Sequence, residues 1–202
     1  MARGPRYNVP YRRRRDRKTD YEKRKSLILS NAPRLVVRTT NKHTIVQVTE
    51  AKTEGDKILA TATSIELKEK FNWKGGCGNT PAAYLTGMLA GFKALEKKVN
   101  RAVPDIGLRK ASPGAKVFAA LKGALDSKLN MPCNEKVLPD ESRIRGDHIA
   151  NYAKQVSSNQ ALYNRHFSQY IARKLSPENL PNHFNETKEK IVEQYAKTGV
   201  SK

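Results

Sequence analysis

The first 25 residues carry the side chains whose chemistry is easiest to assign, and we call this segment the arm. It holds 11 basic and 3 acidic residues, a net charge of +8, and 3 tyrosines. Basic side chains neutralise phosphates and tyrosine rings stack on unpaired bases, so this mixture favours binding to nucleic acid. The predicted contacts of the arm are Arg3, Arg6, Tyr7, Tyr11, Arg12, Arg13, Arg14, Arg15, Arg17, Lys18, Thr19, Tyr21 and Arg24.

A solvated, solubilising tail is the alternative for the arm. All but one of the residues from Arg12 to Arg17 are positively charged. These charges repel one another, which favours a bound counter-charge over a free tail. The arm also has almost no aliphatic side chains, so burial cannot offset the entropy of ordering it. We therefore expect the arm alone to be disordered.

A second group of candidate residues stands at a predicted turn between two strands. Hydroxyl, amide and positively charged groups in such a turn can donate to phosphate and sugar oxygens, and the amide of Asn41 can read a base edge. An ordinary polar hairpin tip is the alternative, but a basic arm at the same sheet edge favours contact with RNA. The predicted contacts of the turn are Arg38, Thr39, Thr40, Asn41, Lys42 and His43.

Two predicted helix starts have groups suited to phosphate. The loop at residues 73–80 reads WKGGCGNT. Glycine-rich loops before helices can cradle phosphate, although this loop lacks the GxxxxGK(S/T) pattern and can equally be a flexible loop that ends in a helix cap. Arg109, Lys110 and Lys116 surround the second start, whose amide end also favours phosphate. We predict RNA contacts for these three residues, with unliganded surface cations as the alternative.

The sequence does not support a catalytic site or a metal site. The four histidines show no HExxH pattern and no paired spacing with Cys77 or Cys133. A nuclease with strands and helices in this order needs carboxylates at strand ends to hold two metal ions. The first predicted strand has none, Asp105 is the only acid in the fourth, and Asp56 only borders the third. We therefore expect a protein that is not an enzyme and needs no cofactor or metal.

Composition points to the same class of partner. The 202 residues include 39 Lys+Arg and 19 Asp+Glu, giving a net charge of +20, with a mean hydropathy of -0.71. An acidic partner such as nucleic acid suits this charge. The most apolar stretch, residues 79–92, is too short and interrupted to span a bilayer, and the N-terminus lacks the apolar segment of a secretory signal. Two cysteines indicate reduced thiols and a cytoplasmic protein.

The elements that must position these residues follow from the apolar pattern. Thr19 and Glu22 match a capping box for a short helix ahead of the first strand. Three strand-like runs come next, with an asparagine-containing turn between the first two, so they form an antiparallel meander. The three predicted strands cover residues 34–40, 43–50 and 57–64.

Two longer helices complete the predicted fold. One starts at Asn79, with a polar cap and an early proline, and the other at Ser112, with a fourth strand at residues 103–108 between them. Strands that alternate with helices after a meander give an α/β layer, in which the fourth strand is parallel to the first. The chain then divides into the arm at 1–25, an α/β core at 26–138 and a C-terminal extension of two or three short helices at 139–202.

The C-terminal extension places aromatic side chains next to arginines. Tyr163, Phe167 and Tyr170 fall within two turns of one predicted helix, beside Arg165 and Arg173. Such a mixture is typical of protein–protein or mixed protein–RNA contacts. Packing of the same side chains against the core is the alternative, and the pattern alone does not decide between them.

Six segments follow one another in an order that is informative: TyrArgArgArgArg (11–15), LysThrAspTyr (18–21), ArgLeuValValArgThrThrAsnLys (34–42), AlaAlaTyrLeuThrGly (82–87), AspIleGly (105–107) and LeuLysGlyAlaLeuAsp (121–126). Together they resemble the archaeal and eukaryotic branch of the L-eighteen family of large-subunit ribosomal proteins. The likeness is colinear from about residue 9 to residue 150. It implies a ribonuclease-H-like α/β layer, and binding to 5S rRNA in the central protuberance, with large-subunit rRNA and neighbouring large-subunit proteins as further partners.

Two other classes of protein share the positive charge. A protein that compacts DNA as chromatin proteins do is the first alternative, but tyrosines and a mixed sheet favour folded RNA, because duplex DNA offers no unstacked bases. A peripheral membrane protein ranks lower, because the arm has no apolar face to insert. We therefore expect neither DNA nor a membrane as a partner.

Overall fold

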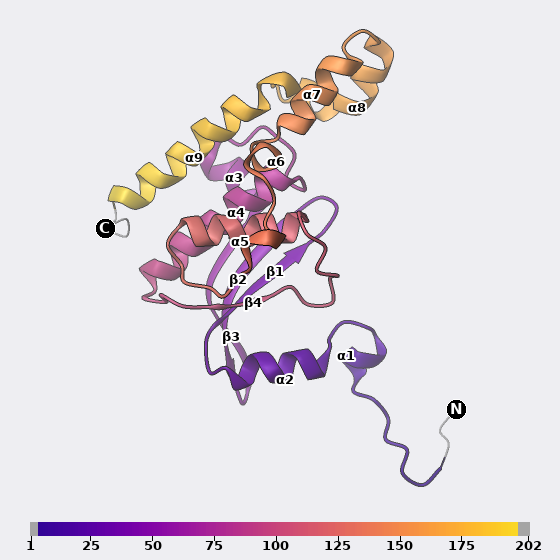
Figure 1. Ribbon diagram of the computed structural model, residues 1–202, viewed down its shortest axis with the longest axis vertical. Coiled ribbons are helices and arrows are strands. Elements are labelled where there is room, and N and C mark those ends of the chain that lie inside the picture. The colour runs from indigo at the N-terminus through magenta and orange to yellow at the C-terminus, as the bar shows by residue number, and fades with distance from the viewer. Residues whose placement is uncertain (1–3, 198–202) are drawn as a thin grey trace.

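The computed structural model describes residues 4–197, so the predicted contact Arg3 lies outside the described residues. Its four strands are β1 (Arg34–Thr39), β2 (Thr44–Lys52), β3 (Gly55–Thr63) and β4 (Val103–Asp105). They form one sheet in the order β3-β2-β1-β4, in which β1 to β3 are an antiparallel meander and β4 is parallel to β1 (Figure 1). The predicted α/β class, meander and parallel fourth strand are confirmed.

Alternation along β1 and β2 decides which face of the sheet is buried. Leu35 pairs with Val48 and Val37 pairs with Val46, and all four side chains are completely buried. Because neighbouring strand residues point to opposite faces, Arg38 lies on the other face and is exposed. The sheet therefore has one core face and one open face, which carries polar and charged groups.

Two long helices, α4 (Thr80–Glu96) and α5 (Lys116–Asp126), cover the core face. The N-cap of α4 is Asn79, as predicted, and its side chain accepts a hydrogen bond from the Ala82 amide. The two helices approach so closely that a Cβ at Gly87 would lie 1.9 Å from the Ala120 carbonyl oxygen. Only glycine fits at this crossing, which lets both helices pack tightly on the sheet.

Two predicted boundaries around β4 are wrong. The strand ends at Asp105, earlier than predicted, because the chain turns at Gly107 with a φ of 64°. The helix expected from Ser112 begins only at Lys116, after a further turn at Gly114 with a φ of 71°. A positive φ does not occur inside a right-handed helix, so Gly114 delays the start of α5.

The short helix predicted ahead of the first strand is α2 (Tyr21–Leu29), and the arm also forms a helix that was not predicted, α1 (Arg12–Arg15). No residue of α1 or α2 is buried. The N-cap of α2 is Asp20, not Thr19, because the Asp20 carboxylate accepts from the amides of Glu22 and Lys23. A third helix, α3 (Ser64–Phe71), was not predicted, although Thr63 and Glu66 form a complete capping box there.

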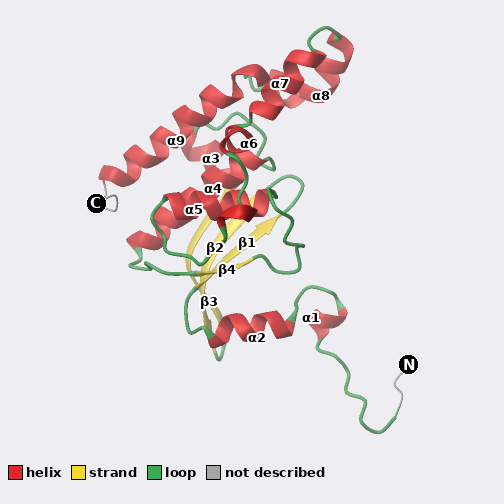
Figure 2. Cartoon of the chain, viewed as in Figure 1, coloured by secondary structure: helices red, strands yellow, loops and turns green. Residues whose placement is uncertain are grey.

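The C-terminal extension is helical, as predicted, but has more helices than expected. Figure 2 shows that they lie on the far side of α4 and α5 from α2. They are α6 (Glu141–Arg145), α7 (Asp147–Val156), α8 (Gln160–Ala172), η2 (Pro177–Asn179) and α9 (Leu180–Lys197), while the short η1 (Glu135–Val137) precedes the extension. None of the helices within residues 4–197 has both the length and the apolar character that a membrane span requires.

Helix α9 is part of the main hydrophobic core. Its Leu180, Phe184, Ile191 and Tyr195 are all buried in that core. Phe184 packs against Tyr84 of α4 with ring centroids 5.6 Å apart, and Tyr195 stacks on Phe92 at 5.1 Å. The C-terminal extension therefore folds together with the α/β layer.

The aromatic residues of α8 mainly pack inside the protein. Phe167 is 5% exposed and contacts the rings of Tyr152, Tyr163 and Tyr170. The Tyr170 hydroxyl accepts a hydrogen bond from the Gly76 amide at 3.3 Å. For Phe167 and Tyr170 the packing interpretation of the sequence pattern is therefore correct.

Replacement of Phe184 by alanine tests the role of α9. We expect Phe184→Ala to lower the free energy of unfolding by about 3–5 kcal/mol, because it leaves a cavity beside Tyr84. The matched control is Leu162→Ala in α8, which is 42% exposed and should cost less than about 0.5 kcal/mol. Both values can be measured by urea denaturation. Equal, small effects would show that α9 does not fold with the layer.

Candidate nucleic-acid interface

A chain of ion pairs fixes the open side of the sheet, and we call it the arginine–aspartate network. Arg24 of α2 donates two hydrogen bonds to the Asp56 carboxylate, at 2.9 and 2.7 Å. Arg34 lies between two carboxylates, 2.7 Å from Asp56 and 3.0 Å from Asp105. Arg38 pairs with Asp105 at 3.1 Å and also donates to its carbonyl oxygen. The network therefore ties α2, β1, β3 and the end of β4 together.

The network makes Asp56 more acidic. Hydrogen bonds from Arg24, and then from Arg34, lower the pKa of Asp56 from its usual 3.8 to about 2, against the opposing effect of burial. A metal-dependent nuclease would need acids at the strand ends, and Asp56 and Asp105 are the acids that the sequence offers there. Each is already held by two arginines, whose positive charge opposes a cation in the same place.

Beside the network lies a hollow of about 350 Å³, the arm groove, between α2 and residues 104–108. Leu27, Pro104 and Ile106 give it apolar walls, while Asp20 and Asp105 are its acidic residues. Arg24 and Arg38 line it too but are partly neutralised by the network, with side chains 32% and 46% exposed. Its basic lining residues are Arg13, Lys18, Lys23, Arg24 and Arg38. The groove therefore has an excess of positive charge.

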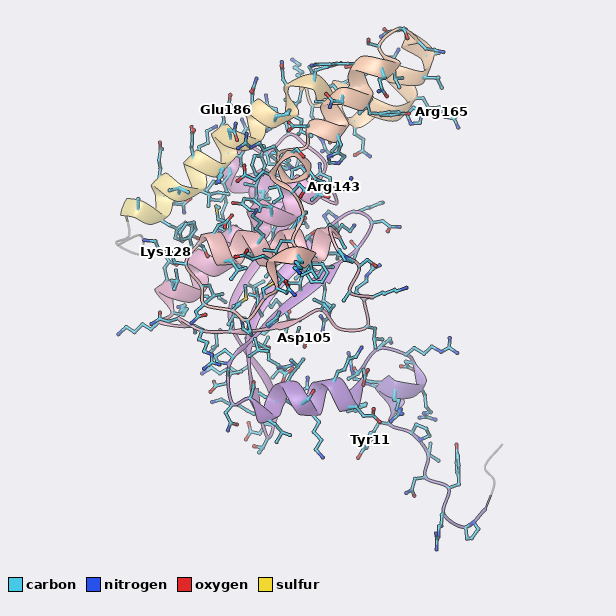
Figure 3. All side chains as sticks on the ribbon, in the orientation of Figure 1. Tyr11, Asp105, Lys128, Arg143, Arg165 and Glu186 are labelled. Carbon is cyan, nitrogen blue, oxygen red and sulfur yellow. The ribbon has the colours of Figure 1, made fainter. Side chains whose placement is uncertain are left out.

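The tyrosines of the arm lie on its surface, as Figure 3 shows for Tyr11. Tyr11 is 72% exposed and its ring centroid lies 5.0 Å from that of Tyr21, while Tyr7 is 46% exposed. Arg13 donates to the Thr19 hydroxyl at 2.8 Å, which connects α1 to the start of α2. The arm thus presents one tyrosine pair next to the exposed arginines of α1.

At the predicted turn, Asn41 and Lys42 are exposed. The turn is closed by Thr40, whose amide donates to the His43 carbonyl oxygen at 2.8 Å and whose hydroxyl accepts from the His43 amide at 2.9 Å. Thr39 is only 6% exposed, so its side chain offers little surface for a contact. The turn therefore presents Asn41 and Lys42, and the threonines hold its shape.

Two of the three cations predicted near α5 support the turn. Lys116 donates to the carbonyl oxygens of Thr40 at 2.8 Å and Gly78 at 3.1 Å. Burial lowers the pKa of Lys116, and the charge of Arg109 adds to this effect. Arg109 donates to the Thr39 carbonyl oxygen at 2.7 Å. Lys110, the third, is exposed.

The glycine-rich loop packs against the turn. A Cβ at Gly78 would lie 2.1 Å from the Asn41 carbonyl oxygen, so only glycine allows this approach. Lys116 then joins the two segments through the carbonyl oxygens of both. The structure thus brings together the turn, the loop and the start of α5, which lie far apart in the sequence.

Sequence reasoning misses several residues that shape the interface. It does not select Arg34, and it treats Asp56 and Asp105 only as metal ligands. Arg34 alternates with Leu35 and Val37 along β1, so its side chain lies on the open face. A charged residue at such a position is the one sign of this role in the local sequence. Its partners lie 22 and 71 residues away in sequence, which no local pattern could supply.

Comparison with known proteins now identifies the family. A family model described as "Ribosomal large subunit proteins 60S L5, and 50S L18" matches residues 5–103 and 93–134. The chain belongs to this family.

Curated relatives of the same family match nearly the whole chain. The chain is 54% identical over 196 residues to the large ribosomal subunit protein uL18 of Staphylothermus marinus, covering 96% of the chain and 97% of that protein. It is 55% identical over 195 residues to the uL18 of Desulfurococcus amylolyticus, covering 96% and 99%. It is 49% identical over 199 residues to the uL18 of Caldivirga maquilingensis, covering 98% and 96%.

The family gives the protein its general role. It is a component of the large ribosomal subunit, with a ribosomal, cytoplasmic location, and its relatives are structural ribosomal proteins. Ribosomal RNA and other ribosomal proteins are therefore its partners. The predicted family is confirmed, and with it the predicted class of rRNA-binding protein that takes part in translation.

The Asp56 ion pairs predict an acid-sensitive contribution to stability. Asp56→Asn should lower the free energy of unfolding near neutral pH by about 1–3 kcal/mol, because it removes charged hydrogen bonds to Arg24 and Arg34. Since the folded pKa is depressed to about 2, the contribution of Asp56 is complete above pH 3.8 and disappears as the pH falls through about 2. Urea denaturation of wild type and variant across this range measures it.

The matched control is Asp16→Asn. Asp16 pairs with Lys18 at 3.4 Å, but both side chains are well exposed, so its replacement should cost under about 1 kcal/mol. A difference between Asp56→Asn and wild type that stayed constant down to the lowest pH would contradict the ion-pair interpretation.

Proposed function

We propose that the protein binds 5S rRNA through the arm, the Asn41 turn and the open side of the sheet. It would help attach that RNA to the large-subunit rRNA in the central protuberance. The observation that carries the proposal is the arm groove with its five basic lining residues next to exposed tyrosines. No bond is made or broken: binding depends on neutralised phosphates and on shape.

The arm supplies most of the charge for this binding. Within residues 4–197, the four arginines of α1 take part in no ion pair, so their charge is available to phosphates. Tyr11 and Tyr21 can stack on bases that are not paired. The remaining exposed arm residues assigned to the same surface are Arg6, Tyr7 and Arg17.

The turn supplies a smaller, more specific contact. Asn41 can donate and accept at a base edge, and Lys42 can pair with a phosphate. Because Lys116 and Arg109 hold the turn from behind, it is ordered before RNA arrives. A preorganised contact costs less entropy on binding than one that must be ordered. Arg109 and Lys116 therefore act by holding the turn, and Lys110 remains a candidate for a direct contact.

Compaction of DNA is the second candidate function, favoured only by the net charge of +20. The two functions differ in what the tyrosines and the turn contribute. Purified protein should bind 5S rRNA in the presence of excess transfer RNA, and should prefer it to a duplex DNA of equal length in the same buffer. Equal affinity for all three nucleic acids would favour compaction.

Removal of the Tyr11 ring tests stacking. Tyr11→Ala should weaken binding to 5S rRNA by about 1–3 kcal/mol if the ring stacks on a base, while binding to duplex DNA should change little. Tyr11→Phe is the matched control and should bind 5S rRNA like wild type. Filter binding at fixed salt measures both. Equal reductions for 5S rRNA and duplex DNA would mean that Tyr11 only orders the arm.

Replacement of the turn side chains tests the second contact. Asn41→Ala combined with Lys42→Ala should weaken 5S binding by about 1–3 kcal/mol for each specific interaction with the RNA that is removed. Both side chains are exposed, so the thermal unfolding midpoint should stay unchanged. A decrease in stability that matched the decrease in binding would instead show that these residues only shape the hairpin.

A further inference from the structure

A second hollow, of about 600 Å³, lies on the other side of the Asn41 turn. Its walls come from four segments: the turn, α3, residues 76–79 of the glycine-rich loop, and the end of α8. We call it the turn–α8 hollow. It joins two helices, α3 and α8, to a turn that already belongs to the candidate interface.

Positive side chains surround this hollow from three directions. Lys42 comes from the turn, Lys68 from the last turn of α3, and Arg173 from the end of α8. The described lining also includes His43, and it contains no carboxylate. Within residues 4–197, none of the three cations takes part in an ion pair. Concentrating unpaired like charges around a concave surface is unfavourable unless an anion is bound there.

Arg173 is held in place for such a role. It donates to the carbonyl oxygen of Gly75 at 2.7 Å and to the Gln169 side chain at 3.4 Å. These partners are neutral, so they orient the guanidinium without cancelling its charge. Burial raises the pKa of the nearby Cys77 thiol, and the positive charges of Arg173 and Lys68 oppose this rise.

We propose that the turn–α8 hollow binds the sugar–phosphate backbone of the 5S rRNA strand that continues past the Asn41 turn. This inference rests on the proposed function and adds a site that the C-terminal extension completes. Lys68 and Arg173 pair with phosphate oxygens, and the amides of Asn41 and Gln169 can bond to sugar hydroxyls. The Asn41 turn forms one wall of the hollow, so an RNA strand on its tip passes directly into it.

Size and composition favour RNA over a protein segment. Acidic peptides also carry negative charge and can be bound by arginine clusters, but peptide sites usually add pockets for the side chains of the peptide. Here Ile65 and Cys77 are the apolar exceptions in a lining of amides and cations. A phosphate backbone needs several cations and hydrogen-bond donors around an open channel.

Two cysteines make the first test possible with the full-length protein. Cys77 lines the turn–α8 hollow, whereas Cys133 lines a separate pocket beside α5. Both thiols are half-buried, and burial raises the pKa of each, so their reactivities can be compared. Alkylation with iodoacetamide, read by mass spectrometry, should slow several-fold at Cys77 when purified 5S rRNA is bound, and stay unchanged at Cys133.

The second test uses two lysines of α3. Lys68→Gln should reduce the salt dependence of 5S binding by about 0.7–0.9 in the slope of log K against log salt, the effect of removing one phosphate pairing. Lys70→Gln is the matched control, because Lys70 lies two positions further along the same helix and pairs with Glu66 at 3.3 Å. It should leave the slope unchanged. Both lysines are exposed, so both variants should fold.

The outcomes separate this inference from the proposed function. Equal slopes for Lys68→Gln and wild type, or full reactivity of Cys77 in a complex with bound 5S rRNA, would overturn the hollow as an RNA site while leaving 5S binding intact. Protection of Cys77 by large-subunit rRNA but not by 5S rRNA would also overturn it. Absence of any 5S binding by the wild-type protein would instead refute the proposed function.

Discussion

The buried guanidinium of Arg34 is the constraint on which the RNA-facing side of this protein depends. Its side chain is 3% exposed, and a buried charge is tolerated only when it is paired and hydrogen-bonded. Asp56 and Asp105 pair with its two terminal nitrogens, leaving only Nε without a partner, and they do so from opposite edges of the sheet, which fixes β3 and β4 relative to β1. Asp56 in turn accepts two bonds from Arg24, so α2 is attached through charge although it buries no side chain of its own.

This constraint divides the basic residues into two groups with different roles. Members of the first group donate to carboxylates or carbonyl oxygens of the protein, and they build the groove and the turn. They include Arg24, Arg34, Arg38, Arg109 and Lys116. The arginines of α1, together with Lys42, keep their charge exposed. A net charge of +20 therefore overstates the charge that is free for RNA, and the position of each cation matters more than the total.

The sequence predicts those features that depend on local patterns. Alternating Leu35, Val37, Val46 and Val48 are enough to define the hairpin and its buried face, and Asn79 with its proline defines the start of α4. Prediction fails where two local signals compete: Thr63 is both the last residue of β3 and the N-cap of α3, so a predicted strand that runs on to Ser64 hides the capping box with Glu66.

Partners that only the tertiary fold brings near are beyond any local pattern. Lys116 and Arg173 donate to backbone carbonyl oxygens of distant segments. Every residue has a backbone carbonyl, so no residue type in the sequence marks which one a cation will bond. The roles of these two side chains in the candidate site therefore required the structure.

The C-terminal helices also help to shape the candidate interface, because they contact the glycine-rich loop that packs behind the turn. The ring of His183 in α9 stacks on Trp73 at 5.1 Å, and its Nε2 accepts a hydrogen bond from the Lys74 amide. Burial lowers the pKa of His183, against the opposing charge of Glu186, and so favours the neutral ring that can accept that bond. Helix α9 thus holds Trp73 and Lys74, and Tyr170 holds the Gly76 amide. These contacts fix the loop so that Gly78 packs against Asn41. The shape of the turn thus depends on residues more than 90 positions later in the chain.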